Sequence, residues 1–135
     1  MDKKQINALH NFVYSQYKDV VKITFKDLEP DDFYSYIISK EVVIPLCTKY
    51  NQTEWTLFAF LHEIGHVMTN TSKMKRCLQE YLATQWAIEE AKKIGFIVPK
   101  SFLYTYQMYI WRWRDESIKH KGKNVPTKEE LTIII

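Results

Sequence analysis

The segment from Trp55 to Met68 places the strongest constraint on how this chain can fold. It is an apolar run into which His62, Glu63 and His66 are set as the pattern His-Glu-x-x-His. Apolar residues that recur at helical spacing, interrupted by polar groups on one face, predict an amphipathic helix rather than a strand. We therefore predict a helix over residues 54–69 and expect the rest of the chain to pack around it.

The spacing of the two histidines suits a zinc site. Residues i and i+4 lie on the same helix face, one turn apart, so His62 and His66 can bind one Zn²⁺ from the same side. Glu63 lies about 100° round the helix from His62, where it can reach a water on the metal without being a ligand. Two histidine ligands and a carboxylate general base are the arrangement of zinc peptidases. The pattern fixes only three positions, so an accidental match in a domain without metal is the alternative.

A catalytic zinc ion usually takes three protein ligands and leaves one position for water. The metzincin class would need a glycine and a third histidine shortly after the motif, and the chain has Thr69 and Ser72 at those positions. The alternative is a carboxylate from the next helix, which returns past the first if the two helices pack antiparallel. Glu80 is well placed for this, and we predict it as the third ligand.

Other side chains compete with Glu80 for the role of third ligand. Glu89 and Glu90 lie more than two turns further along the second helix, which makes them distant. Cys77 is nearer the turn and could bind zinc as a thiolate, but a carboxylate beside two histidines better preserves the Lewis acidity of the metal. Asp115 and His120 would need to arrive through tertiary folding, and nothing in their spacing recommends them.

Composition and length predict one α+β domain over residues 1–135. Hydrophobic residues make up 46% of the chain and charged residues 26%, which is ordinary for a globular domain. The net charge of +3 gives no strong case for nucleic-acid binding. Two cysteines are too few for a disulfide framework, and the chain has no signal-peptide region and no run of about 18 apolar residues. We therefore expect a soluble cytoplasmic protein without direct contact to membrane or nucleic acid.

Periodicity predicts four helices, a short sheet and a tail, in a small zincin-like domain. The predicted helices cover 3–17, 54–69, 74–94 and a segment that begins at Pro99 or Ser101. Alternation and turn residues predict strands near 20–28, 33–38 and 42–46, the last two as a hairpin, in a mostly antiparallel three-stranded sheet. In the second long helix we expect an inward face that includes Leu78, Leu82 and Trp86, to which Ala83, Ile88 and Ala91 can be added.

Three further expectations concern the surroundings of the motif. Residues 121–135 form a tail with a short helix start at 125–130, and its apolar end can dock on the body, join a sheet edge or fill a groove as a self-inhibitor. We expect the strand at 42–46 to pair with an extended substrate through backbone hydrogen bonds, by β-augmentation. The tyrosines that are chemically able to stabilise an oxyanion are Tyr50, Tyr81, Tyr106 and Tyr109.

The segment from Glu80 to Ala87, EYLATQWA, resembles the E-x-x-A-N/D-x-F-A element that follows H-E-L/I-G-H in ImmA/IrrE-type metallopeptidases. With the order of predicted elements, the resemblance covers roughly residues 5–115. It implies a cytosolic zinc peptidase that cleaves a regulatory protein, often a repressor encoded on a phage or mobile element. The family usually has Asn or Asp at the position of Thr84, where it orients a zinc histidine, and a threonine hydroxyl is a weaker, neutral partner.

The function predicted from the sequence is zinc-dependent endopeptidase activity on a specific protein substrate. In this prediction His62, His66 and Glu80 bind the metal, and Glu63 is the catalytic base. Thr84 does not bind the metal but orients a zinc histidine through a hydrogen bond from its imidazole N–H. The departure at Thr84 leaves a second hypothesis open, in which the chain is a zinc-containing interaction module that binds a regulator without efficient cleavage.

Overall fold

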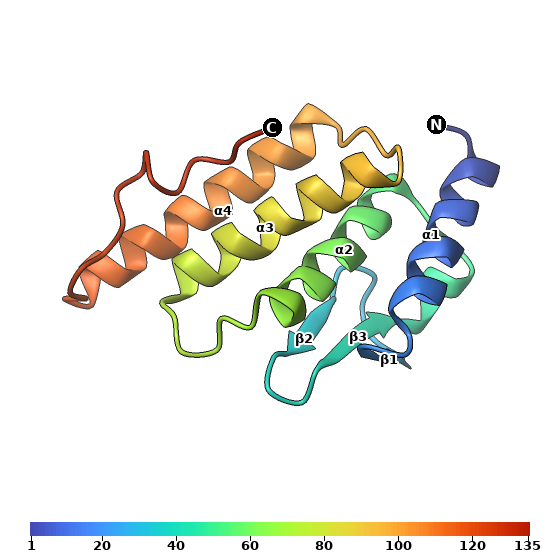
Figure 1. Cartoon of the computed structure of the whole chain (residues 1–135), viewed down its shortest axis with the longest axis horizontal. Helices are drawn as coiled ribbons and strands as arrows, with labels where there is room; N and C mark the ends of the chain where they lie inside the picture. Colours follow the sequence, from blue (N-terminus) through green and yellow to red (C-terminus); the bar gives the residue numbers. More distant parts are fainter.

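The computed structural model describes all 135 residues and has the predicted α+β architecture. In chain order the elements are α1 (Lys3–Tyr17), β1 (Lys22–Lys26), β2 (Tyr34–Tyr36), β3 (Glu41–Pro45), the short 3-10 helix η1 (Leu46–Lys49), α2 (Glu54–Thr69), α3 (Arg76–Lys93) and α4 (Lys100–Lys119). Figure 1 shows α2, α3 and α4 side by side, with the sheet and α1 on the opposite side of α2. None of the helices is long and apolar enough to cross a membrane.

The helix α2 is the central element of the fold. It begins where predicted, because the Thr53 side chain accepts a hydrogen bond of 3.1 Å from the backbone N–H of Thr56 and so caps the helix. It packs against α1, α3, β2 and β3. From Leu57 to Val67 every residue except Glu63 is buried. The helix therefore holds the two motif histidines inside the molecule, while Glu63 keeps access to solvent.

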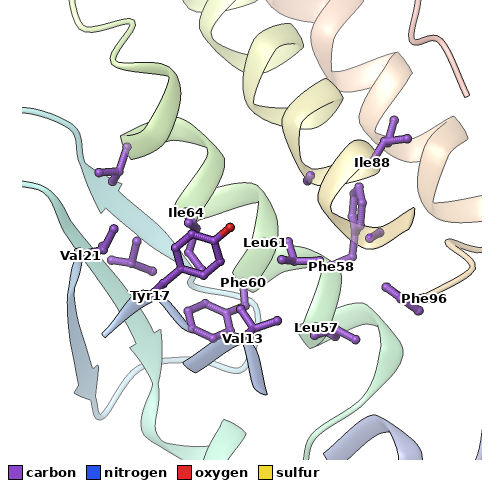
Figure 2. Close-up of a cluster of buried hydrophobic side chains, with 14 of the residues drawn as sticks. Val13, Tyr17, Val21, Leu57, Phe58, Phe60, Leu61, Ile64, Ile88 and Phe96 are labelled. Atoms are coloured by element: carbon purple, nitrogen blue, oxygen red, sulfur yellow. The ribbon is translucent and has the colours of Figure 1, made fainter. Parts of the chain in front are cut away.

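The hydrophobic core forms where α1, α2, α3 and the sheet meet. Figure 2 shows the side chains of α2 at its centre, in contact with residues from α1, the strands and α3. The labelled residues are Val13, Tyr17, Val21, Leu57, Phe58, Phe60, Leu61, Ile64, Ile88 and Phe96. Each fully buried side chain of this size contributes roughly 1.5–3 kcal/mol relative to exposure, so the core fixes the position and rotation of α2.

The sheet has the strand order β1-β3-β2 and is mixed. The hairpin prediction is confirmed, since β2 and β3 are antiparallel, with Tyr34 opposite Val43. The expectation of a mostly antiparallel sheet holds for this pair only, because β1 and β3 run parallel. As the central strand, β3 has both edges paired, so the prediction that it receives a substrate strand is wrong. The two edge strands of the sheet are β1 and β2.

The most deeply buried face of α3 is made largely of small residues. Ala83, Ala87 and Ala91 are fully buried, whereas Leu82 and Trp86 are only half-buried. The predicted inward positions of Ala83, Ile88 and Ala91 are confirmed, and Leu78, Leu82 and Trp86 lie at the margin of this face. Small side chains let the two helix backbones approach closely, which decides how near α3 comes to the motif histidines.

The apolar end of the tail docks along α3 and α4 (Figure 1, red). The side-chain amide of Gln107 donates to the carbonyl of Leu131 at 2.9 Å and accepts from the N–H of Ile133 at 2.7 Å. Gln85 donates to the carbonyl of Ile134 and accepts from its N–H at 2.6 and 2.9 Å. The tail thus adds to no sheet edge, and the predicted helix start at 125–130 is a turn.

Leu131→Ala is expected to destabilise the fold by about 2–5 kcal/mol, the usual cost of removing a fully buried leucine side chain. Leu131 is completely buried in a small cluster with Cys77 and Ile110, so the substitution leaves a cavity between α3 and α4. Urea unfolding measures the change. The matched control is Ile134→Ala, whose side chain is exposed and whose loss is expected to cost about 0.5 kcal/mol or less. Equal effects of the two substitutions would contradict the docked position of the tail.

His10 is a packed side chain on α1 and takes no part in the motif. It is 4% exposed, its ring stacks on Phe60, and its Nε2 lies 2.9 Å from the hydroxyl of Thr56. Burial lowers the pKa of His10 to about 4, against the opposing effect of a hydrogen bond with the backbone of Thr53. The imidazole is therefore neutral in the folded protein under conditions in which the unfolded chain protonates it.

The difference in unfolding free energy between the wild type and His10→Gln is expected to shrink by about 3 kcal/mol from pH 7 to pH 4. Because the folded pKa is depressed, the stabilisation is complete above the unfolded pKa of 6.5 and is lost as the pH falls towards 4. Urea unfolding at several pH values measures this. A difference that stays constant with pH would contradict the neutral, buried state of His10.

Candidate metal centre

The motif faces a cleft of about 580 Å³ bounded by α2, the first turns of α3, α4 and the edge strand β2. His62, Glu63 and His66 line it from α2, and Glu80 lines it from α3. β2 borders it with all its residues, Tyr34 to Tyr36. No tail residue lies in the cleft, so the self-inhibitor role considered for the tail does not apply to this structure.

The three predicted ligands meet at one point in the cleft. One oxygen of Glu80, Oε2, lies 3.1 Å from Nε2 of His62 and 3.1 Å from Nε2 of His66. All three residues are buried, with 4%, 6% and 1% of their surface exposed for His62, His66 and Glu80. The antiparallel pairing of α2 with α3 thus brings Glu80 to the motif, as the sequence predicted.

These donor atoms fit a zinc ion. With bonds of about 2.0–2.1 Å and tetrahedral angles, ligand atoms around zinc stand about 3.3 Å apart, close to the separations in this structure. Although Oε2 of Glu80 lies 3.1 Å away, Nε2 of His62 is buried and makes no hydrogen bond of acceptable geometry, which costs roughly 1–3 kcal/mol unless another group satisfies it. A metal at the meeting point of His62, His66 and Glu80 would supply that group.

Glu63 is an alternative third ligand on distance alone, because ligand atoms of His62, Glu63 and His66 lie within 4.8 Å of one another. Its Oε2, however, contacts Nδ1 of His62 at 3.1 Å, the ring nitrogen that faces away from Glu80. Its Oε1 accepts a hydrogen bond of 3.1 Å from the hydroxyl of Ser35 on β2. These contacts hold Glu63 beside the metal position, where a general base is needed, and favour Glu80 as the ligand.

The charges of the site are arranged to stabilise ionised groups. Burial alone would lower the pKa of His62, but its hydrogen bond with Glu63 and the adjacent carboxylate of Glu80 raise that pKa to about 9. Burial would raise the pKa of Glu80, but the two imidazoles beside it hold that pKa well below its usual range. Glu80 is therefore a carboxylate at neutral pH, as a metal ligand must be.

The structure brings none of the competing residues into the site. Cys77 is buried in the cluster with Ile110 and Leu131, and it does not line the cleft. Glu90 lies nearly three turns further along α3, where it accepts a hydrogen bond from Tyr17, and Glu89 pairs with Lys92 at the surface. The exposed residues Asp115 and His120 lie on or just after the last turns of α4, also outside the cleft.

Comparisons with protein-family models, with curated proteins and with solved structures found no match to this chain. The resemblance to ImmA/IrrE-type metallopeptidases therefore remains a prediction drawn from two short segments. The meeting of His62, His66 and Glu80 is an observation of the structure and does not depend on that resemblance.

Thr84 does not support an imidazole in this structure. Its hydroxyl donates to the backbone carbonyl of Glu80 at 2.7 Å, one turn earlier in the same helix, and makes no hydrogen bond to His62 or His66. The residue that holds Glu80 is Arg76, whose Nε donates to Oε1 of Glu80 at 2.8 Å. Arg76 precedes Glu80 at i,i+4 spacing, a pattern in the sequence that could have indicated it.

Two of the four tyrosines considered as oxyanion donors lie at the cleft. Tyr106 and Tyr109 line it from α4, whereas Tyr50 and Tyr81 do not. The ring centroid of Tyr106 is 4.7 Å from that of His62. Burial, together with the negative charges of Glu63 and Glu80, raises the pKa of Tyr106, which keeps its hydroxyl protonated and able to donate. Of these four tyrosines, Tyr106 is the one whose ring contacts a motif histidine.

Gly65 sets the distance between α2 and α3 beside the site. A Cβ atom at this position would lie 2.7 Å from the backbone carbonyl oxygen of Ala83 and 3.2 Å from the ring of Trp86. The nearest atom belongs to a helix backbone, which cannot rotate away as a side chain can. The absence of a side chain at Gly65 thus permits the approach that brings Glu80 to His66.

Gly65→Ala is expected to weaken zinc binding more than it weakens the fold. Overpacking costs roughly 1–3 kcal/mol, and the better helix propensity of alanine offsets about 1 kcal/mol of it. The displaced α3 carries Glu80 away from the imidazoles, so we expect at least about a tenfold loss of zinc affinity, as for other disturbances around metal ligands. Competition with a chelator measures it, with the exposed Met68→Ala as control. Unchanged affinity in Gly65→Ala would contradict the role of this contact.

Proposed function

We propose that this protein is a zinc-dependent peptidase that cleaves a peptide bond in a protein substrate. The observation that carries the proposal is the meeting of His62, His66 and Glu80 in an open cleft, with Glu63 beside them and outside the ligand set. Two imidazoles and one carboxylate suit zinc and leave one coordination position free.

His62, His66 and Glu80 would hold the metal, which when bound supplies Lewis acidity and a water of lowered pKa. Glu63 takes a proton from the attacking water and delivers it to the leaving amine. The hydroxyl of Ser35 keeps the Glu63 carboxylate turned into the cleft. The hydroxyl of Tyr106 donates a hydrogen bond to the carbonyl oxygen of the cut bond as negative charge develops there.

The shape of the cleft favours an extended peptide as substrate. β2 is an edge strand and lies along the cleft, so its unpaired backbone groups can bond to a peptide laid beside it. Aromatic side chains line the same space and offer contacts to apolar residues of the peptide. They are Phe33, Tyr34, Tyr36, Trp55, Tyr106 and Tyr109.

The proposed class of substrate is a regulatory protein, which is what the resemblance to the ImmA/IrrE family implies. The same resemblance implies a cytosolic protein that acts on a repressor of a phage or mobile element. A second candidate function is a zinc-containing interaction module that binds such a regulator without efficient cleavage. The hydroxyl of Thr84 favours this second candidate, because it bonds to its own helix and leaves the imidazoles without a side-chain partner from α3 other than Glu80.

Peptide profiling tests the proposal on many candidate substrate sequences at once. The zinc-loaded protein is incubated with a proteome-derived peptide library, and new amino termini are identified by mass spectrometry. We expect cleavage at a restricted set of sequences, lost with a zinc chelator and restored by added zinc. Zinc binding without any chelator-sensitive cleavage, of peptides or of intact regulatory proteins, would favour the interaction module.

A further inference from the structure

We propose that Arg76 binds a carboxylate of the substrate, so that the cleft accepts peptides with an acidic group close to the bond that is cut. The acidic group is either an Asp or Glu side chain or the carboxyl terminus of the peptide. The inference rests on the proposed function in taking a peptide as the ligand, and it assigns that peptide a chemical feature.

Arg76 is the only lysine or arginine that lines the cleft. Half of its side-chain surface is exposed, although Nε is bonded to the buried carboxylate of Glu80. The other charged residues of the lining that are not histidines are Asp31, Glu63 and Glu80. Away from the metal position, an anionic group on the substrate is therefore repelled by these carboxylates and attracted by Arg76.

The guanidinium is held in place with its terminal nitrogens available. Nε donates to Oε1 of Glu80 at 2.8 Å, and the group lies over the ring of Trp113 at 5.0 Å. Tyr109 is a second polar partner of the guanidinium beside Glu80, and the remaining N–H groups of the terminal nitrogens are the ones that can bind a ligand. Fixing the plane of the guanidinium in advance reduces the entropy lost when a carboxylate binds.

The bond to Glu80 leaves part of the guanidinium unused. Arginine frequently bonds to both oxygens of one carboxylate through two parallel N–H groups. Here Oε2 of Glu80 faces the two imidazoles, so Arg76 can bond only to Oε1. A single carboxylate, that of Glu80, links Arg76 to the metal position. A substrate carboxylate bound to the free N–H groups of Arg76 would therefore belong to a residue one or two positions from the cut bond.

Matched metal-binding probes test the inference through binding rather than catalysis. The first pair consists of two short peptidyl hydroxamates, one with a free carboxyl terminus and one with a terminal amide. In the second pair both termini are blocked, and a Glu side chain is compared with Gln. Calorimetry gives the affinity of each probe for zinc-loaded wild type, Arg76→Gln and Arg76→Lys. The control is Lys73→Gln, which removes an exposed charge outside the cleft.

In the wild type we expect the acid of at least one pair to bind about 10–100-fold more tightly than its amide, as for hydrogen bonds between charged groups. The pair that shows the preference identifies the source of the carboxylate. Arg76→Gln should bring that ratio close to one, Arg76→Lys should retain part of it, and Lys73→Gln should leave it unchanged.

Two results would overturn the inference while leaving the metal centre intact. One is equal binding of acid and amide to the wild type in both pairs. The other is an Arg76→Gln variant that weakens acid and amide by the same factor, which would mean that Arg76 acts only through Glu80. If none of the four probes binds to the zinc-loaded wild type, the proposed metal centre fails together with the inference. Preserved discrimination without peptide cleavage would remove the peptidase proposal alone.

Discussion

The substitution Glu63→Gln is expected to reduce peptide hydrolysis by about 10²–10⁴-fold, the usual contribution of a general base, and to leave zinc affinity nearly unchanged. Glutamine preserves the shape of the side chain and its hydrogen bond from Ser35, but its amide cannot accept a proton from water. Zinc affinity survives because Glu63 contacts Nδ1 of His62, away from the point where His62, His66 and Glu80 meet.

The measurement combines zinc content with the rate of cleavage of a peptide identified by profiling. Glu54→Gln is the matched control, because it makes the same chemical change at the start of the same helix, outside the cleft. Loss of zinc from Glu63→Gln would show that Glu63 is a ligand. Unchanged cleavage in Glu63→Gln would remove Glu63 as the base and contradict the proposed mechanism.

The substitution Glu80→Gln is expected to weaken zinc binding by more than about 100-fold, beyond the 10–100-fold typical of residues that only support a ligand. It replaces an anionic ligand with a neutral amide and removes the partner of the Arg76 guanidinium. Competition with a fluorescent chelator measures the affinity.

Glu89→Gln on the same helix is the control for Glu80→Gln, since Glu89 is exposed and pairs only with neighbouring surface residues. Its zinc affinity should match the wild type. If Glu80→Gln binds zinc as tightly as the control, the third ligand is another group. Glu63 is then the candidate, because its carboxylate lies within 4.8 Å of the two histidine ligand atoms.

Local signals in the sequence predicted the helices well. The helices α1 and α2 begin where predicted, and the side chains of Asp2 and Thr53 cap them. The spacing of His62, His66 and Glu80 was sufficient to predict a common site, because an antiparallel helix pair joined by a short turn leaves few alternatives. These features depend on interactions within a few residues or between adjacent helices.

Non-local pairing could not be predicted in the same way. The position of β3 between β1 and β2 depends on which strands pair after the chain turns. The alternation of apolar and polar residues predicts which face of a strand is buried, but not which strand lies beside it. The bond from Ser35 to Glu63 and the docking of Leu131 beside Cys77 join distant segments without any local pattern. On α3 the sequence did not show that the small residues are buried more deeply than Leu78, Leu82 and Trp86, because this depends on the close approach of the α3 backbone to Gly65.

Anomalous diffraction at the zinc edge, from crystals of the zinc-loaded protein, locates the metal and its ligands in a single experiment. We expect one strong peak in the cleft, with Nε2 of His62, Nε2 of His66 and a carboxylate oxygen of Glu80 at about 2.0–2.2 Å from the metal. Glu63 should lie outside this ligand set, with its carboxylate directed at the remaining position. A peak bound by Glu63 in place of Glu80, or no peak between the two histidines, would contradict the proposed metal centre.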